Sequence, residues 1–181
     1  RFNHLSCFYS KIQEKKLVLF NMKKPIFSRP SSFLFLLVGI FCIGTIILSC
    51  SGKVKKDEVV IYLVRHAEKD LTDPTNVNPP LTAIGEARAE KLVKEMKGVK
   101  LEAVYSTEYD RNIKTVEPLC NDRGMDIQNY TAFEFSEMLD FMKTNKGKAF
   151  LVCGHGDNLL PMVDYLGGTR PIESLGHTEN D

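Results

Sequence analysis

Four residues of this sequence combine anion binding with nucleophilic chemistry, and each follows a predicted strand. Arg65 and His66 come directly after the apolar run 59–64, Arg111 opens the helix expected after a second strand, and His155 follows a third. An arginine presents a planar, permanently charged fork that matches phosphate oxygens. A neutral imidazole can attack phosphorus, and a second histidine can donate a hydrogen bond to the charge that develops. These residue types in this order predict phosphoryl chemistry at an anion site.

The proton donor for such chemistry is left open by the residues. Asp157 lies at the end of the third predicted strand and is the better-placed acid. Glu134 and Glu137 lie in a segment whose apolar spacing predicts an amphipathic helix, which favours a solvated face for both carboxylates. Glu68 and Lys69 follow the first strand, where they are able to border the site, but a solvated pair in a loop is the favoured interpretation. We therefore carry Asp157, Glu68, Glu134, Glu137 and no donor at all as alternatives.

The elements that must position these residues alternate between strands and helices. Apolar runs predict strands at 59–64, 101–106 and 149–154, and helical spacing predicts helices within 81–98, 109–124, 133–147 and 159–168. Pro118 lies inside the second helix, so a kink or an early end is expected there. The alternation predicts an α/β fold, a three-layer sandwich with a mostly parallel central sheet, helices on both faces and a minimal cap. Ligands of such sheets bind at the carboxyl ends of the strands.

Two other kinds of hydrolytic site fit the sequence poorly. A cysteine phosphatase built on Cys153 needs an arginine six positions later, where the chain has Leu159. A metal hydrolase could use the two histidines with Asp157, but the neighbouring arginines would repel a cation, and no pair of histidines has helical spacing. We expect no metal and no cofactor, and we expect Cys120 and Cys153 to be buried thiols.

The N-terminal part of the chain has the composition of a targeting segment. Of the 24 Lys/Arg residues, seven lie in residues 1–49 beside a single acid, Glu14, so the remainder is mildly acidic and has no electrostatic footprint for nucleic acid. Met22 opens a cationic stretch, and the apolar run 33–48 precedes Cys50. This order resembles a bacterial lipoprotein signal, in which Cys50 is the lipidated residue. A single transmembrane anchor is the alternative, although sixteen residues are short of the roughly 20 that span a bilayer.

These observations divide the chain into four parts. Residues 1–21 are expected to be an upstream extension, 22–49 a lipoprotein signal peptide, 50–58 a tether, and 59–181 the functional domain. The expected location is the bacterial cell envelope, with the domain held on the extracytoplasmic side by a lipid anchor in the membrane.

Three blocks of the domain resemble the histidine phosphatase superfamily, also called phosphoglycerate mutase-like, in its small phosphohistidine-phosphatase-like branch. The blocks read "LVRHAEK", "VYSTEYDRNIKTVEP" and "LVCGHGDN", with "PPLTAIGEARA" between the first two, and the resemblance spans residues 59–168. It implies that His66 is the phosphorylated nucleophile, that Arg65 and Arg111 clamp the phosphoryl group, and that His155 is the second pocket histidine.

The resemblance implies a metal-independent phosphatase that acts on phosphomonoesters or phosphohistidine, in small molecules or phosphoproteins, through a phosphohistidine on His66. The alternatives are a non-catalytic lipoprotein that binds a phosphorylated ligand and a phosphoglycerate mutase-like phosphotransferase. Members of the family usually add a further strand near the C-terminus, and no β-rich run follows Gly168, so we expect a truncated C-terminus.

Overall fold

The computed structural model describes residues 8–12, 15–20 and 54–170, which form one six-stranded sheet and four helices. The sheet has the order β1-β2-β3-β6-β4-β5, with β1 antiparallel to β2 and every other pair parallel. The strands are β1 (Phe8–Ile12), β2 (Lys15–Phe20), β3 (Val59–Arg65), β4 (Leu101–Ser106), β5 (Ile127–Asn129) and β6 (Ala149–Gly154). The helices are α1 (Ala83–Glu95), α2 (Asp110–Arg123), α3 (Ser136–Thr144) and α4 (Gly156–Tyr165).

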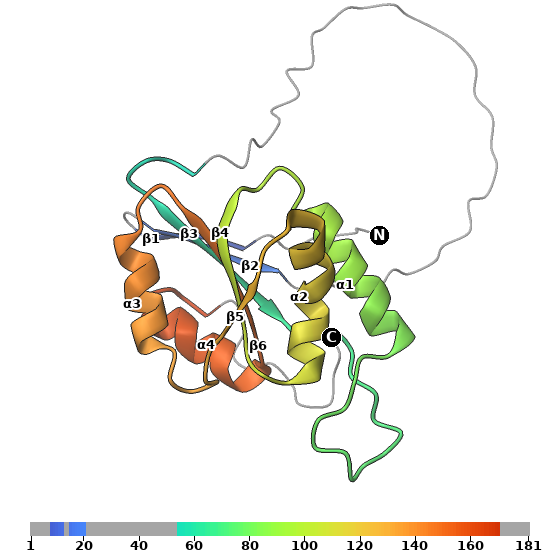
Figure 1. The fold of residues 1–181 in the computed structure, drawn as a ribbon. Helices are drawn as coiled ribbons and strands as arrows, with labels where there is room; N and C mark the ends of the chain where they lie inside the picture. The colour runs from blue at the N-terminus through green and yellow to red at the C-terminus, as the bar shows by residue number, and fades with distance from the viewer. Residues whose placement is uncertain (1–7, 13–14, 21–53, 171–181) are drawn as a thin grey trace, which may run out of the picture.

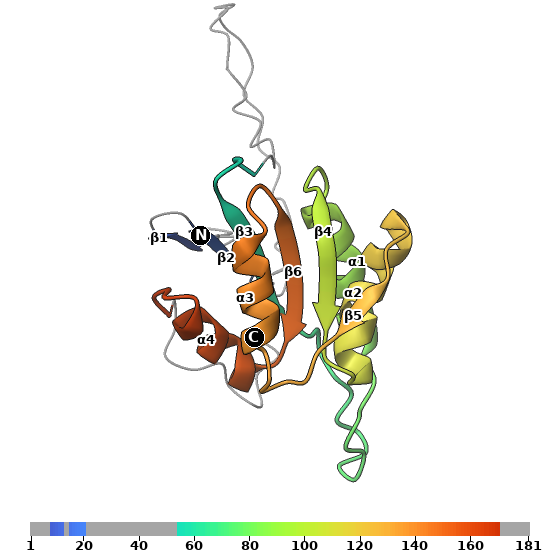
Figure 2. The same cartoon turned by 60° about the vertical axis from the view of Figure 1, so that its left-hand side comes forward.

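The helices form a layer on each face of the sheet, which confirms the predicted three-layer α/β fold. Helices α1 and α2 lie on one face and α3 and α4 on the other (Figures 1 and 2). Side chains that alternate along β3 and β6 point into two separate apolar cores. Leu92 of α1 and Leu119 of α2 belong to the first core, and Leu139 of α3 and Met162 of α4 belong to the second. Burial of both faces explains why these strands read as continuous apolar runs.

The parallel pairing of β3 with β6 brings two distant segments together at the carboxyl edge of the sheet. Arg65 pairs with Gly154, and the backbone N–H of His66 donates to the carbonyl oxygen of Gly154 over 3.0 Å. The residues that follow each strand, His66 and His155, are therefore neighbours because of strand register, although 89 positions separate them in the sequence.

The start of α1 is held against the loop that follows β3. Thr82 caps the helix, since its hydroxyl accepts from the N–H of Gly85 over 3.1 Å. Gly85 packs against the backbone of Glu68, and the Thr82 N–H donates to the Glu68 carbonyl over 2.8 Å. This contact anchors the segment that begins with His66.

Three helices differ from the sequence prediction. The second one does not end early at Pro118 but continues to Arg123. Proline removes one backbone hydrogen bond and costs about 3 kcal/mol in a helix interior. Val116, Leu119 and Cys120 flank it in the core, and their burial outweighs that cost. The third helix is shorter than 133–147, because it begins only at Ser136 and leaves the exposed Phe133 in the preceding turn.

Helix α4 begins at Gly156, three residues earlier than predicted, and places Asp157 in its first turn. The backbone N–H of His155 donates to the Oδ1 of Asn158 over 2.8 Å, which stabilises this early start. Strand β5 was not predicted, because its three residues are too short to show a period.

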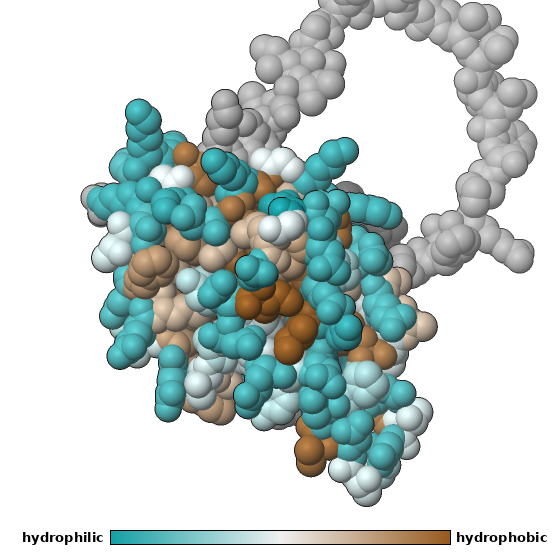
Figure 3. Space-filling model, viewed as in Figure 1, coloured by the Kyte–Doolittle hydropathy of each residue, from teal (hydrophilic) through white to brown (hydrophobic). Residues whose placement is uncertain are grey.

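The predicted signal peptide 22–49 and Cys50 lie outside the described residues, as do parts of the predicted extension 1–21, of the tether and of the C-terminal tail. Within the described part of the chain, no helix is long and apolar enough to cross a membrane. Hydrophilic residues cover most of the face seen in Figure 3, with a small hydrophobic patch near its centre. Scattered apolar exposure of this size is ordinary for a protein surface.

Candidate functional site

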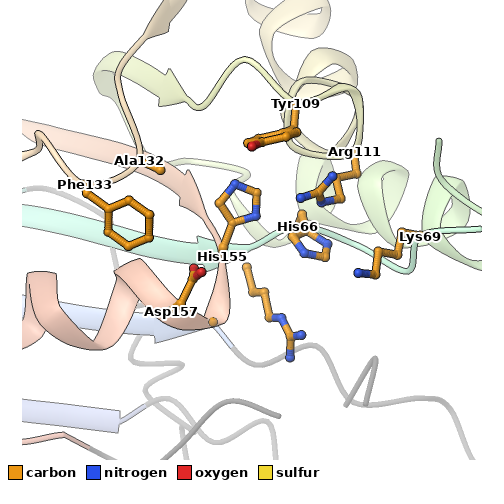
Figure 4. A pocket seen from close by; sticks show the side chains of 10 residues that line it. His66, Lys69, Tyr109, Arg111, Ala132, Phe133, His155 and Asp157 are labelled. Atoms are coloured by element: carbon orange, nitrogen blue, oxygen red, sulfur yellow. The ribbon is translucent and has the colours of Figure 1, made fainter. Parts of the chain in front are cut away.

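A pocket of 140 Å³ lies at the carboxyl edge of the sheet and collects the residues singled out from the sequence (Figure 4). Four chain segments contribute to it: the loop after β3, the start of α2, the turn before α3 and the start of α4. Its lining consists of Arg65, His66, Lys69, Tyr109, Arg111, Ala132, Phe133, His155, Gly156 and Asp157. Both predicted arginines, both predicted histidines and Asp157 are therefore together.

His66 is held in one tautomer by the chain itself. Its Nδ1 lies 2.8 Å from the carbonyl oxygen of Ala67, an oxygen that only accepts, so Nδ1 carries the proton. Nε2 is then the unprotonated ring nitrogen. The N–H of Ala67 donates in turn to the Oγ1 of Thr115 over 2.9 Å, which holds the segment against α2.

The charge state of His66 follows from its burial. The residue is 7% exposed, and loss of hydration lowers the pKa of its imidazole from 6.5 to about 3. His155, Arg111 and Arg65 add smaller effects in the same direction, because each disfavours a further positive charge. The imidazole is consequently neutral at pH 7, which is the form with a free electron pair.

His155 is oriented by a hydroxyl and by the first histidine. Its Nε2 lies 3.0 Å from the Oγ1 of Thr107, and its ring meets the His66 ring edge to face, with centroids 5.4 Å apart. Burial lowers the pKa of His155 to about 4, and Arg111 acts in the same direction. Which partner of that hydrogen bond is the donor is set by the tautomer of the ring.

Arg111 presents unused donors inside this pocket. Its buried Nε and Nη1 atoms have no hydrogen-bond partner within the described chain, and its guanidinium lies 4.4 Å from the centroid of the Tyr109 ring. Burial lowers its pKa, although an arginine stays charged at any physiological pH. A bound anion would accept hydrogen bonds from these unpaired N–H groups and balance the charge of the guanidinium. Arg65 lines the same pocket, and Gly156 and Asp157 add the N-terminal turn of α4, whose dipole favours negative charge.

Of the four carboxylates considered as proton donors, only Asp157 lines the pocket. Glu68 is instead buried in an ion pair with Arg88, with Oε1 and Nη1 2.9 Å apart and side chains 5% and 12% exposed. The prediction of a solvated Glu68 is therefore wrong, because the close packing of α1 on the loop encloses it. Glu134 and Glu137 are exposed and are not part of the pocket lining.

Lys69, Tyr109 and Phe133 belong to the pocket but were not assigned to it from the sequence. Lys69 was expected in a solvated loop pair, yet it lines the pocket, and partial burial followed by repulsion from Arg111 and Arg65 lowers its pKa. The closeness of Lys69 to His66 in the sequence was a signal that Lys69 lines the same pocket. No sequence signal marked Phe133, because its place in the pocket lining depends on the position of the turn before α3 in the folded chain.

The described residues include two buried thiols but no cluster of metal-ligating side chains. Cys120 and Cys153 are free and buried, as predicted, and burial raises the pKa of both thiols, that of Cys120 to about 11. A buried thiol of raised pKa is a poor nucleophile. Among residues 8–12, 15–20 and 54–170, no three His, Cys, Asp or Glu side chains gather in a way that would hold a metal ion.

Residues 61–138 match the model of the histidine phosphatase superfamily (branch 1), which confirms the resemblance seen in the motifs. No match is found among curated proteins. Three solved structures are similar in fold, each with a TM-score of 0.49. A phosphoserine phosphatase from Entamoeba histolytica, crystallised with 3-phosphoglyceric acid, is 14% identical and aligns over 60% of this chain and 80% of its own.

The other two structures carry the name SixA. The protein histidine phosphatase SixA complexed with tungstate is 21% identical over 62% of this chain and 80% of its own. A putative phosphohistidine phosphatase SixA from Agrobacterium tumefaciens is 22% identical over 60% of this chain and 75% of its own. At these identities the structures carry no argument about substrate, and the family match alone supports a phosphatase function in general.

Proposed function

The segment 61–138 places this chain in the histidine phosphatase superfamily, and on that premise we propose a metal-independent phosphatase that hydrolyses phosphomonoesters or phosphohistidine through a covalent phosphohistidine on His66. One observation carries the proposal above the others. The hydrogen bond from Nδ1 of His66 to Ala67 leaves Nε2 unprotonated in a pocket lined by Arg65 and Arg111. A neutral nitrogen beside permanent cations is the arrangement that in-line attack on a phosphoryl dianion requires.

In the first step the electron pair of Nε2 forms a bond to phosphorus while the bond from phosphorus to the leaving group breaks. The leaving group departs with that electron pair and takes up one proton. In the second step a water molecule attacks the phosphohistidine, the P–N bond returns its electron pair to Nε2, and the proton of the water is released. Throughout, Nδ1 keeps its proton and donates a hydrogen bond to the Ala67 carbonyl oxygen. The phosphorylated ring therefore carries a positive charge, which favours hydrolysis of the P–N bond.

The remaining residues stabilise charge on the phosphoryl oxygens. Arg111 brings two unpaired donors, and each charge-assisted hydrogen bond contributes about 1.5–3 kcal/mol. We propose that His155, protonated on Nε2, donates to Thr107 in the free pocket and to a phosphoryl oxygen when substrate is bound. Asp157, the carboxylate of the pocket lining, is the group we propose to protonate the leaving group.

The test is turnover of 4-nitrophenyl phosphate and of a phosphohistidine peptide by the full chain in EDTA. Wild type should turn over at least one of them, and brief reaction with radiolabelled substrate should leave acid-labile, base-stable label on the protein. His66→Ala should lose turnover by more than about a thousandfold and lose the label. Lys114→Ala, a change at an exposed position of α2, serves as the control and should retain both. Phosphate binding without turnover in wild type would indicate the non-catalytic alternative and overturn the proposal.

We also propose that the domain is tethered to the extracytoplasmic face of a membrane through a lipid on Cys50. The support is the order of cationic stretch, apolar run and cysteine in the sequence. Metabolic labelling with a palmitate analogue in a bacterial host should mark the wild-type chain and leave Cys50→Ala unmarked. Equal labelling of both chains would contradict the anchor.

A further inference from the structure

A second cavity of 350 Å³ adjoins the phosphoryl pocket and has no role in the mechanism above. The two cavities share three wall residues, Tyr109, Ala132 and Phe133. Thr107, Glu108, Asn129, Tyr130 and Thr131 complete the second one. A phosphoryl group bound between Arg111 and His66 would therefore have its substituent directed either to solvent or into this cavity, which lies between the loops after β4 and β5.

The charge of the second cavity is opposite to that of the first. Arg65, Lys69 and Arg111 line the phosphoryl pocket, whereas Glu108 is the one charged residue among the eight that line the second cavity. The side chain of Glu108 is exposed and contributes a carboxylate to the wall of this cavity. A substituent that carries a carboxylate would meet this charge with no cation from the cavity wall to offset it.

The walls of the cavity suit a flat, apolar group. Phe133 lines both cavities, and 69% of its surface is exposed. A large aromatic side chain left exposed in a turn beside a pocket is a common anchor for a ligand. Tyr130 forms a fixed wall, because its hydroxyl donates to the carbonyl oxygen of Cys153 over 3.0 Å and accepts from Asn158 over 3.3 Å.

We propose that this second cavity is the subsite for the leaving group, and that it selects uncharged or cationic aromatic groups against groups that carry a carboxylate. Phe133 supplies the contact surface and Glu108 the charge discrimination. The inference rests on the proposed function, since it names the substrate class of the same site.

The charge discrimination is tested with 4-carbamoylphenyl phosphate and 4-carboxyphenyl phosphate, which have nearly the same shape and differ in one charge. Glu108→Gln should raise kcat/KM for the carboxylate by roughly three- to tenfold, the size expected for one charge pair near a protein surface. It should leave kcat/KM for the carboxamide unchanged. Glu90→Gln, which neutralises an exposed glutamate of α1 outside both cavities, is the matched control and should change neither value.

The aromatic contact is tested with the carboxamide substrate and with methyl phosphate, which is too small to reach the second cavity. Phe133 lines both cavities, so the ratio of the two kcat/KM values is what tests the contact: Phe133→Ala should lower kcat/KM for the aryl substrate relative to that for methyl phosphate by roughly tenfold, the value of one aromatic contact. Phe141→Ala removes another exposed phenylalanine, on α3 and outside both cavities, and should affect neither substrate.

A binding measurement separates this inference from the proposed function. Calorimetric titration of the wild-type chain with 4-carbamoylbenzylphosphonate and 4-carboxybenzylphosphonate requires no turnover. Tighter binding of the carboxamide than of the carboxylate, with a smaller preference in Glu108→Gln, would support the subsite. It would do so even if no substrate were hydrolysed, a result that would overturn the proposed phosphatase activity. Equal affinities in wild type, or an unchanged preference in the variant, would overturn the subsite while leaving hydrolysis intact.

Discussion

The Nδ1 atom of His66 lies 2.8 Å from the carbonyl oxygen of Ala67, and this single contact decides which ring nitrogen is available for chemistry. Because the acceptor belongs to the next residue of the chain, the tautomer is set by local backbone geometry and does not depend on a bound ligand. The N–H of Ala67 is held in turn by Thr115 of α2. The proposed nucleophile therefore has its unprotonated nitrogen in place before any ligand binds.

Both pocket histidines should remain neutral well below their ordinary pKa of 6.5. Burial lowers the pKa of His66 to about 3 and that of His155 to about 4, so the unfolded chain binds more protons than the folded one between these values and 6.5. The contribution of these histidines to the free energy of unfolding should therefore be complete above about pH 6.5 and decrease as the pH drops through this window. Nitrogen NMR of the free protein should show no titration of either imidazole between about pH 5 and 8.

Replacing the buried histidine tests the same linkage. His66→Gln should flatten the decrease of unfolding free energy between about pH 6.5 and 4, as measured by urea unfolding, because one of the two linked groups is gone. A midpoint near 6.5 for either imidazole in wild type would show that the pocket is far better hydrated than the structure indicates.

Thr107 is expected to act through His155 as a positioning residue. Thr107→Val keeps the shape but removes the 3.0 Å hydrogen bond to Nε2, and one such bond contributes about 0.5–1.5 kcal/mol. We expect kcat to fall by roughly two- to tenfold with little change in KM. Thr107→Ser retains the hydroxyl and should restore most of kcat. If the valine and serine variants lose activity equally, packing and not the hydrogen bond is what matters.

Gly85 should be intolerant of alanine, although alanine is the better helix former. A Cβ atom at this position would overlap the carbonyl oxygen of Glu68 and lie 3.1 Å from its backbone nitrogen. The overlap should outweigh the gain of about 1 kcal/mol in helix propensity and lower both stability and activity, because the same loop carries His66.

Gly124 offers a matched comparison for this change. It ends α2 with a φ of 61° and has open space around it, so Gly124→Ala should cost only about 1 kcal/mol and leave activity unchanged. Thermal unfolding of both variants, together with turnover, checks the pair. A Gly85→Ala variant as stable as wild type would show that α1 can move away from the loop.

The buried pair of Glu68 and Arg88 should be more costly to break than to replace. Glu68→Gln leaves the guanidinium of Arg88 buried without its counter-charge and should destabilise the fold by about 3–5 kcal/mol. The double variant Glu68→Gln with Arg88→Met removes both charges and should recover a large part of that loss. Denaturant unfolding of the single and double variants measures the coupling, and simple additivity would argue that the pair is solvated.

Short-range signals account for what could be predicted about the fold. The apolar runs of β3, β4 and β6 depend on neighbouring residues, so their place was visible in the sequence. The continuation of α2 through Pro118 was not, because it depends on what the helix packs against. Strand β5 depends on pairing with β4, a contact that no local pattern records.

By itself, the sequence determined the chemical types at the strand ends and the α/β order that places strand ends along one edge. Arg65, His66, Arg111 and His155 were recognisable because short motifs carry their chemistry and parallel strands end together. Only the tertiary structure decided the charge state of His66, the enclosure of Glu68 by Arg88, and the second cavity beside Phe133. The physical reason is that burial and hydration arise from segments far apart in the chain, and they decide which polar groups are neutral, paired or open to a ligand.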